Sequence, residues 1–332
     1  KKAEAQVLMP LRLCSQKERP VHFNNVMEAW LQSRKDTVKQ SSFSQYSVVV
    51  QRHLMPSLGM QTLDSFSSAT VEQYIQAKRR NGRLDGKGGL SPKTIADQIV
   101  ILKQVLSFAV EHNWMQPKIL NFRAPASKKF RPELLSKSDW TRLDQFLRAS
   151  KDLKMLGVLI AMHTGLRIGE ISALRFSDID LQSGILSVNQ TVLRIKNTDT
   201  NSTSKTGIII NTPKTEYSHR KIPLPTFLLT ILKQALLSAS SRDAYIITGT
   251  EHCMEPRVFY RQYQSIQKKC DVDRYTFHAL RHTFATRCIE NGCDPKTLSE
   301  LLGHASVRIT LERYVHPSMD AKRVIMERLA NM

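Results

Sequence analysis

An arginine stands among apolar residues in the stretch HALRHTFATR, at positions 278–287. At helical periodicity Arg281 shares one face with Leu280, Phe284 and Cys288. An unpaired buried charge costs several kcal/mol, so this guanidinium needs an anionic partner. That partner is either a carboxylate of the same chain, in an internal salt bridge, or an anionic ligand that enters a cleft.

A histidine and a tyrosine follow Arg281 along the chain. The segment 294–303 begins with Asp-Pro and ends in glycine, which is typical of a short capped helix, and it delivers His304 just past its end. Ser306 then caps a helix over 307–314 and places Tyr314 on the inward face. An inward tyrosine is ordinarily a core residue with a satisfied hydroxyl, so Tyr314 alone does not indicate catalysis.

Two more cationic residues occupy positions that suit an anion. Arg167 follows the glycine-bearing turn at 164–165 and opens a helix, where free backbone N–H groups and the helix dipole favour negative charge. Lys214 lies in the expected β-turn of TPKTEYSHRKIPLP, where a lysine is usually just solvated. Each signal is weak when taken alone.

A zinc site is an alternative use of the histidines. His278 and His282 are four residues apart, the spacing of a zinc-binding pair on a helix. The stretch lacks the glutamate of HExxH, a third ligand would have to come from His304 or His316, and Arg281 between the pair would repel the cation. We therefore expect no metal and no other cofactor; the ATP-binding pattern GxxxxGK[ST] is also absent.

Composition favours a polyanionic partner. The 332 residues include 49 Lys and Arg against 29 Asp and Glu, a net charge of +20. Residues 1–125 carry 18 basic and 9 acidic side chains and the remainder 31 and 20, so both halves are basic. Nucleic acid is the favoured partner, ahead of an anionic membrane surface or a solvated basic surface without a partner.

Cysteine usage and hydropathy indicate the cellular compartment of the protein. The five cysteines are an odd number without CxxC spacing, which indicates reduced thiols. They are Cys14, Cys253, Cys270, Cys288 and Cys293. No apolar run approaches the length of a membrane span, and no signal-like segment opens the chain. We expect a soluble, cytoplasmic protein.

The pattern of elements predicts a mainly α fold with a small antiparallel sheet. Four helical stretches fill residues 23–115, the last of them capped by Ser91-Pro92, and a glycine-rich basic loop at 81–90 precedes it. Residues 121–131 have the composition of a linker. Alternating β-branched residues in 183–225 predict strands, and helices resume from 225 to the end.

In order and spacing, the motifs TGLRIGE, TPKT, HALRH, LLGH and RY resemble those of the tyrosine recombinases, the family of phage and conjugative-transposon integrases and of chromosome-dimer resolvases. These motifs cover residues 164–316. The helical region before them is similar to the family's core-binding domain in length and helix content, although not in diagnostic sequence.

The resemblance implies a catalytic set of six residues: Arg167, Lys214, His278, Arg281, His304 and Tyr314. In this family the two arginines clamp the non-bridging oxygens of a DNA phosphate, a job that suits planar guanidinium groups. By the same resemblance His304 donates a further hydrogen bond, His278 assists proton transfer near Tyr314, and Tyr314 attacks phosphorus. Lys214 then protonates the 5′ oxygen, which leaves phosphorus as the 3′-phosphotyrosine forms. The flanking His282 receives no role and is interpreted as structural.

The resemblance also implies an architecture and partners. We expect a tail or linker at 1–21, a helical core-binding domain at 22–125, a linker at 126–131, a catalytic domain at 132–317 and a C-terminal tail at 318–332. The two domains would form a C-shaped clamp on double-stranded DNA at specific attachment sites. The expected backbone contacts are Lys78, Arg79, Arg80, Arg83, Lys93, Lys128 and Lys129. Residues 1–21 are too few for the separate arm-binding domain of many integrases, which is absent or was removed.

The tail is expected to dock into a neighbouring subunit and help assemble a homotetramer on DNA, with accessory DNA-bending or directionality proteins as further partners. A mobile-element integrase is the favoured interpretation. The alternatives are a chromosome-dimer-resolving recombinase, a catalytically inactive DNA-binding scaffold and, on related chemistry, a type IB topoisomerase. The intact catalytic set argues against the inactive scaffold, and the LLGH segment with the short helical first domain argues against the topoisomerase.

Overall fold

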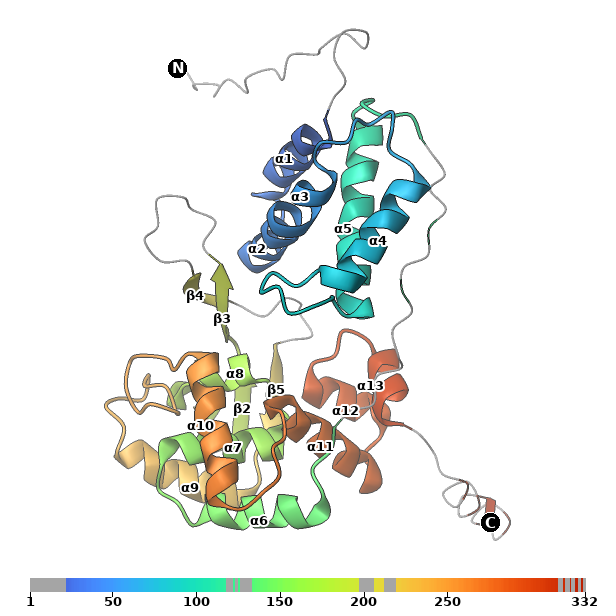
Figure 1. Cartoon of the computed structure of the whole chain (residues 1–332). Helices are drawn as coiled ribbons and strands as arrows, with labels where there is room; N and C mark the ends of the chain where they lie inside the picture. Colours follow the sequence, from blue (N-terminus) through green and yellow to red (C-terminus); the bar gives the residue numbers. More distant parts are fainter. Residues whose placement is uncertain are drawn as a thin grey trace, which may run out of the picture. The chain divides into compact units, whose positions relative to one another are not determined.

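The computed structural model describes residues 22–117, 122, 125, 133–196, 206–211 and 219–315, together with 319, 323, 326, 327 and 330. These residues form two compact units, an N-terminal helical unit and a larger unit of helices and strands (Figure 1). The prediction of a mainly α fold with a small antiparallel sheet is confirmed, and the described strands form two such sheets. No helix in the described part of the chain is both long enough and apolar enough to span a membrane.

The N-terminal unit packs its helices around one apolar core. Its α-helices are α1 (Phe23–Arg34), α2 (Gln40–Val49), α3 (Met55–Leu58), α4 (Ser68–Asn81) and α5 (Pro92–Glu111). The longest, α5, begins as predicted: the Ser91 hydroxyl accepts the backbone N–H of Thr94, and Pro92 occupies the first helical position. Helix α5 packs against α1, and its Ile95, Ile99 and Leu102 belong to the same buried cluster as Trp30 of α1.

The second of the four expected helical stretches is not one regular α-helix. Between α2 and α3 the backbone forms a π-helical segment, Val50–Leu54. Pro56 lies in the next turn and has no N–H to donate to the carbonyl of Arg52, against which its ring would clash in a regular helix. A widened turn relieves that clash, which is a common cause of such irregularities.

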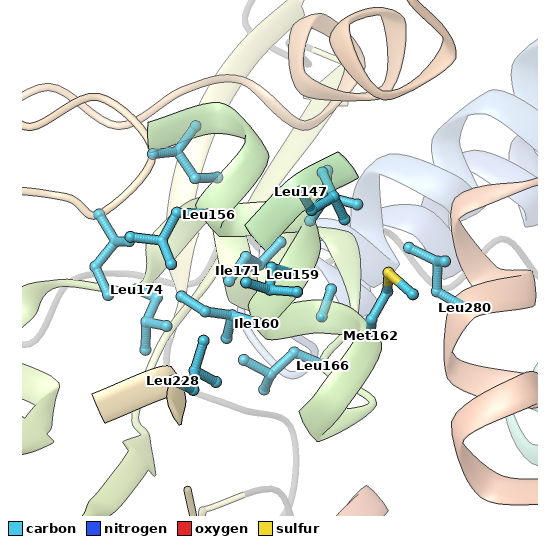
Figure 2. Close-up of a cluster of buried hydrophobic side chains, with 14 of the residues drawn as sticks. Leu147, Leu156, Leu159, Ile160, Met162, Leu166, Ile171, Leu174, Leu228 and Leu280 are labelled. Atoms are coloured by element: carbon cyan, nitrogen blue, oxygen red, sulfur yellow. The ribbon is translucent and has the colours of Figure 1, made fainter. Parts of the chain in front are cut away.

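The larger unit is built around a buried central helix. Its helices are α6 (Lys137–Arg148), α7 (Leu153–Thr164), α8 (Ile168–Ala173), α9 (Thr226–Leu237), α10 (Pro256–Lys269), α11 (Phe277–Glu290), α12 (Pro295–Leu302) and α13 (Val307–Tyr314). Helix α7 is apolar on nearly all sides, and α6, α10 and α11 pack around it. Figure 2 shows Leu159, Ile160 and Met162 of α7 inside this core, with Leu147 and Leu280 among the side chains drawn around them.

Two small antiparallel sheets complete this unit. Strands β1 (Ile179–Asp180), β2 (Ile185–Val188) and β5 (Arg220–Pro223) form one sheet in the order β1-β2-β5, and β3 (Thr191–Lys196) pairs with β4 (Thr206–Asn211). Strands within 183–225 were predicted, whereas β1 was not. In β5 the buried Arg220 and Ile222 alternate with exposed residues, so Arg220 points into the protein.

Two glycines end helices beside one another. Helix α12 ends at Gly303, as predicted, and α7 ends at Gly165, in the predicted glycine-bearing turn; both glycines are left-handed, with φ of 63° and 66°. A Cβ at Gly165 would lie 2.7 Å from the Phe284 ring and 2.9 Å from a Leu302 methyl group. The end of α7 therefore lies directly against α11 and α12.

Candidate active site

Tyr314 is the last residue of α13 and is buried. The helix starts as predicted, because the Ser306 hydroxyl accepts the backbone N–H of Arg308. The Tyr314 ring is 6% exposed and packs with Ala285, Leu298 and Leu302. Its hydroxyl lies 2.7 Å from Nδ1 of His282.

Three histidines surround this tyrosine in different ways. His282 is buried and contacts the hydroxyl directly. His278, one turn earlier on α11, is exposed and packs edge-on against the His282 ring, with 4.5 Å between ring centroids. The His304 ring lies parallel to the Tyr314 ring with centroids 6.3 Å apart, and its Nδ1 is 2.8 Å from the Thr310 hydroxyl.

Arg281 is 2% exposed and is held by backbone carbonyls. Its Nη1 donates to the Gly165 carbonyl at 2.8 Å and its Nη2 to the Leu302 carbonyl at 2.6 Å. Within the described residues no carboxylate forms an ion pair with it. The internal salt bridge, one of the two alternatives from sequence, is therefore not observed in the described part of the chain.

Three arginines converge on the C-terminal turn of α12. Arg220 donates from Nε to the Leu301 carbonyl at 2.7 Å, Arg281 donates to the next carbonyl, and Arg167 donates to the Gly303 carbonyl at 3.4 Å. The carbonyls at a helix C-terminus have no intrahelical partner and carry the negative end of the helix dipole. The same turn that delivers His304 thus gathers three guanidinium groups.

One carboxylate links two of these arginines. Glu170 is three residues after Arg167, and its Oε2 accepts the Arg167 backbone N–H at 2.9 Å while its Oε1 accepts Nη1 of Arg167 at 2.7 Å. Arg220 approaches the same carboxylate with Nη2 at 2.8 Å and Nη1 at 3.2 Å. A single buried negative charge thus lies among three positive ones, so the site retains an excess of positive charge.

This field and burial shift the ionisation of the neighbouring groups. Burial, followed by the charge of Arg167, lowers the pKa of Arg281 to about 9, so the guanidinium remains charged at neutral pH. Burial and the nearby arginines lower the pKa of His304 to about 3. Although part of the His278 ring reaches solvent, partial desolvation with the charges of Arg281 and Arg167 lowers its pKa to about 4. Burial raises the pKa of the Tyr314 phenol, and Arg281 and Arg313 oppose that rise.

The structure brings together five of the six residues expected to act in catalysis: Arg167, His278, Arg281, His304 and Tyr314. Lys214 lies outside the described residues. Sequence reasoning missed the parts played by His282, Glu170 and Arg220. The sequence held a signal for two of them: Glu170 stands at the capping-box distance from Arg167, and Arg220 stands two residues before Ile222, on the same face of a strand.

Among the described residues no three His, Cys, Asp or Glu side chains lie close enough together to hold a metal ion. His316, one of the ligands weighed for a zinc site, lies outside them. The two histidines with zinc-pair spacing meet edge to face, and Nδ1 of His282 is engaged by Tyr314.

The basic residues expected to contact DNA differ in how free their charges are. In the described structure Arg83 pairs with Asp85 at 2.7 Å, and Lys93 lies 3.3 Å from Asp97. Lys78 lies over the Tyr74 ring, with its Nζ 5.3 Å from the centroid. Arg79 and Arg80 are exposed at the end of α4 and have no ion pair within the described residues. Lys128 and Lys129 fall outside those residues.

Next to His304 the larger unit has a hollow of about 670 Å³ between β5 and the α12–α13 turn. Its lining includes His219, Lys221 and Lys296, together with Ser306 at the start of α13. Its basic side chains suit a phosphate backbone.

Comparison with known proteins finds matches in both units of the chain. The model of the phage integrase family matches residues 134–321, and that of the phage integrase N-terminal SAM-like domain matches residues 22–79. A XerC-like tyrosine recombinase of Caldanaerobacter subterraneus subsp. tengcongensis is 30% identical, over 79% of this chain and 72% of its own length. The transposase of transposon Tn916 from Enterococcus faecalis is 25% identical, over 82% of this chain and 68% of its own.

Solved structures show the same fold. The Tn1549 transposon integrase in complex with transposon right end DNA superposes with a TM-score of 0.73 at 24% identity, over 93% of this chain and 99% of that one. A lambda integrase dimer bound to a core site gives 0.62 at 16% identity, over 89% and 98%. Because the integrase family model spans more than half of the chain, this protein belongs to the phage integrase family of tyrosine recombinases.

Proposed function

We propose that this tyrosine recombinase cuts and rejoins double-stranded DNA at specific attachment sites through a 3′-phosphotyrosine at Tyr314, for the integration and excision of a mobile element. The observation that carries the proposal is the buried guanidinium of Arg281, which lies close enough to oppose the rise in the Tyr314 pKa and forms no ion pair with a carboxylate in the described structure. A DNA phosphate supplies the missing counter-charge.

The roles follow from the chemistry of each group. Arg167 and Arg281 bind the non-bridging oxygens of the phosphate, and their charge stabilises the transition state. His304 donates a hydrogen bond to the same phosphate, since its Nδ1 is 2.8 Å from Thr310 and leaves Nε2 for the substrate. His278 assists proton transfer near Tyr314. Lys214 protonates the departing 5′ oxygen.

The reaction needs neither metal nor ATP. Guanidinium groups supply the positive field that a metal ion provides in many other phosphoryl-transfer enzymes. The phosphotyrosine bond retains the energy of the broken phosphodiester, so a 5′ hydroxyl of another strand can attack it and restore a continuous strand.

Binding to DNA involves both basic halves of the chain. The proposed domains are 22–125 for core binding and 132–317 for catalysis, and both contact the duplex. The exposed Arg79 and Arg80 contribute phosphate contacts in the core-binding domain. The dependence of DNA affinity on salt concentration measures such contacts directly.

Strand exchange requires four active sites, so we propose a homotetramer on two DNA sites. Residues 318–332 help to assemble it. Accessory DNA-bending or directionality proteins are further partners. Resolution of chromosome dimers is the alternative use of the same chemistry. Similarity to a XerC-like recombinase supports this alternative, and similarity to transposon proteins supports the mobile element.

The test is covalent trapping. A binding site is first selected from random duplexes, then placed in a nicked suicide substrate and mixed with the protein in EDTA, beside Tyr314→Phe. A denaturing gel should show a protein–DNA band for the wild type and none for the variant. Tight binding without any band from either protein would favour the inactive scaffold.

A further inference from the structure

His282 is the histidine that touches the tyrosine hydroxyl. Its Nδ1 lies 2.7 Å from that oxygen, which is within the range of a strong O–H···N hydrogen bond. Both residues are buried, His282 at 2% and Tyr314 at 6% exposure. The contact joins α11 to α13, 32 positions apart in the sequence.

The other two histidines are less well placed to take a proton from this hydroxyl. His278 contacts the His282 ring by its edge and forms no hydrogen bond with Tyr314 in the described structure. His304 stacks parallel to the tyrosine ring, with 6.3 Å between centroids, and its Nδ1 faces Thr310. A proton acceptor must lie within hydrogen-bonding distance of the proton, and of the three, His282 meets that condition.

We propose that His282 is the general base of the cleavage step and takes the phenolic proton of Tyr314 directly, with His278 acting through it. This inference rests on the proposed function, because it concerns the attack of Tyr314 on a DNA phosphate. It assigns catalysis to the residue that follows Arg281, which the sequence had left as structural.

The proton and electron changes balance. His282 begins neutral, with its proton on Nε2 and a lone pair on Nδ1 that accepts the tyrosine O–H. As the phenolic oxygen forms its bond to phosphorus, the proton moves to Nδ1 and the bond from phosphorus to the 5′ oxygen breaks. That oxygen takes a proton from the general acid, the role proposed for Lys214. In rejoining, His282 returns its proton to the phenolic oxygen.

The charges around His282 couple this transfer to substrate binding. Burial, His278, Arg313 and Arg281 lower the pKa of His282 to about 4, so the free protein holds it neutral with its lone pair available. Burial meanwhile raises the pKa of the Tyr314 phenol, so the proton stays on Tyr314. A bound phosphate adds negative charge beside the arginines, which raises the pKa of His282 and strengthens it as a base.

The central variant is His282→Asn, whose amide oxygen replaces Nδ1 as a hydrogen-bond acceptor without accepting a proton. Single-turnover cleavage is measured on the suicide substrate in wild type, in His282→Asn and in the matched His278→Asn. Thermal unfolding and DNA affinity are recorded for each variant. We expect His282→Asn to bind DNA normally and to cleave about 100-fold or more slowly, within the usual contribution of a general base.

One change in the substrate and one in Tyr314 distinguish a general base at position 282 from a residue with another role. A substrate with sulfur in place of the bridging 5′ oxygen needs no general acid, so it should restore cleavage to Lys214→Ala but not to His282→Asn. Fluorinated tyrosine at position 314 has a more acidic phenol, so it should recover much of the loss in His282→Asn. A residue that merely positions Tyr314 would show no such recovery.

Several outcomes would overturn the assignment. These are near-normal cleavage by His282→Asn, rescue of that variant by the sulfur substrate, or no recovery with fluorotyrosine. The assignment would also fail if His278→Asn alone showed the loss and the recovery. Absence of a covalent product from the wild-type protein would instead reject the proposed function, and this inference with it.

Discussion

Arg220 and Glu170 form a buried, two-pronged ion pair, with Nη2 at 2.8 Å from Oε2 and Nη1 at 3.2 Å from Oε1. Their side chains are 4% and 7% exposed. Because Glu170 also binds Arg167 and Arg220 also binds the Leu301 carbonyl, the pair connects α8, β5 and the end of α12. Arg167 is therefore fixed in place before any substrate arrives.

Removal of one partner from this pair should destabilise the protein strongly. We expect Arg220→Met to lower the free energy of unfolding by about 3–5 kcal/mol, because Glu170 is left buried without its bidentate partner. The matched control is Arg308→Met, which breaks a solvent-exposed pair with Glu312 and should change the free energy of unfolding little. Urea unfolding of both variants provides the comparison, and equal losses would contradict the structural role of Arg220.

Acid should destabilise the DNA-free protein through its histidines. The pKa of His304 is lowered to about 3 in the folded protein from an ordinary value of 6.5, so the folded state prefers the neutral ring. The associated stability is present above pH 6.5 and is lost as the pH falls from 6.5 toward 3. His304→Gln should flatten the decline of unfolding free energy between pH 6.5 and 4; an unchanged slope would show that His304 is not the responsible group.

Gly165 should tolerate no side chain. Ala at this position would adopt a left-handed backbone, at a cost of about 1–2 kcal/mol, and would also meet Phe284 and Leu302. Gly292→Ala is the control, since its φ is 83° but nothing lies within 4 Å of the added Cβ. The free energy of unfolding should fall further for Gly165→Ala than for the control. Covalent trapping should fall only in Gly165→Ala, because the Gly165 carbonyl holds Arg281. Similar behaviour of the two variants would refute this account.

Salt dependence should distinguish the basic residues of the N-terminal unit. Loss of Arg79 and Arg80 together should reduce the slope of log K against log salt by about 1.8, if each neutralises one phosphate. Arg83→Ala should change the slope less, because Asp85 already pairs with Arg83. Fluorescence anisotropy across a salt series measures both slopes, and the reverse ranking would assign the phosphate contact to the loop.

Deletion of residues 318–332 should separate binding from recombination. We expect DNA affinity to remain within a few-fold of the full chain, while assembly on paired sites and recombination fall. Gel shifts and sedimentation report binding and assembly, and an intramolecular recombination assay reports exchange. Undiminished recombination would remove the tail from the proposed tetramer.

Sequence alone determined the features that depend on interactions between residues close together in the chain. Caps at Ser91, Asp294 and Ser306 and the left-handed glycines at Gly165 and Gly303 are decided within one helical turn, and each was predicted. The order of motifs identified the family and the candidate catalytic residues. The position of Arg281 on an apolar face was also predictable, because periodicity alone shows that a charge lies there.

Contacts between distant segments were decided by the tertiary structure. No local rule indicates that Nδ1 of His282 reaches Tyr314, since the contact depends on how α13 folds back over α11. Nor does the sequence show that Arg220, Arg281 and Arg167 share the last turn of α12, because these arginines come from β5, from α11 and from the start of α8, which tertiary packing brings together there. Spacing predicts which residues share a helix face; packing of one face on another decides which of them can exchange a proton.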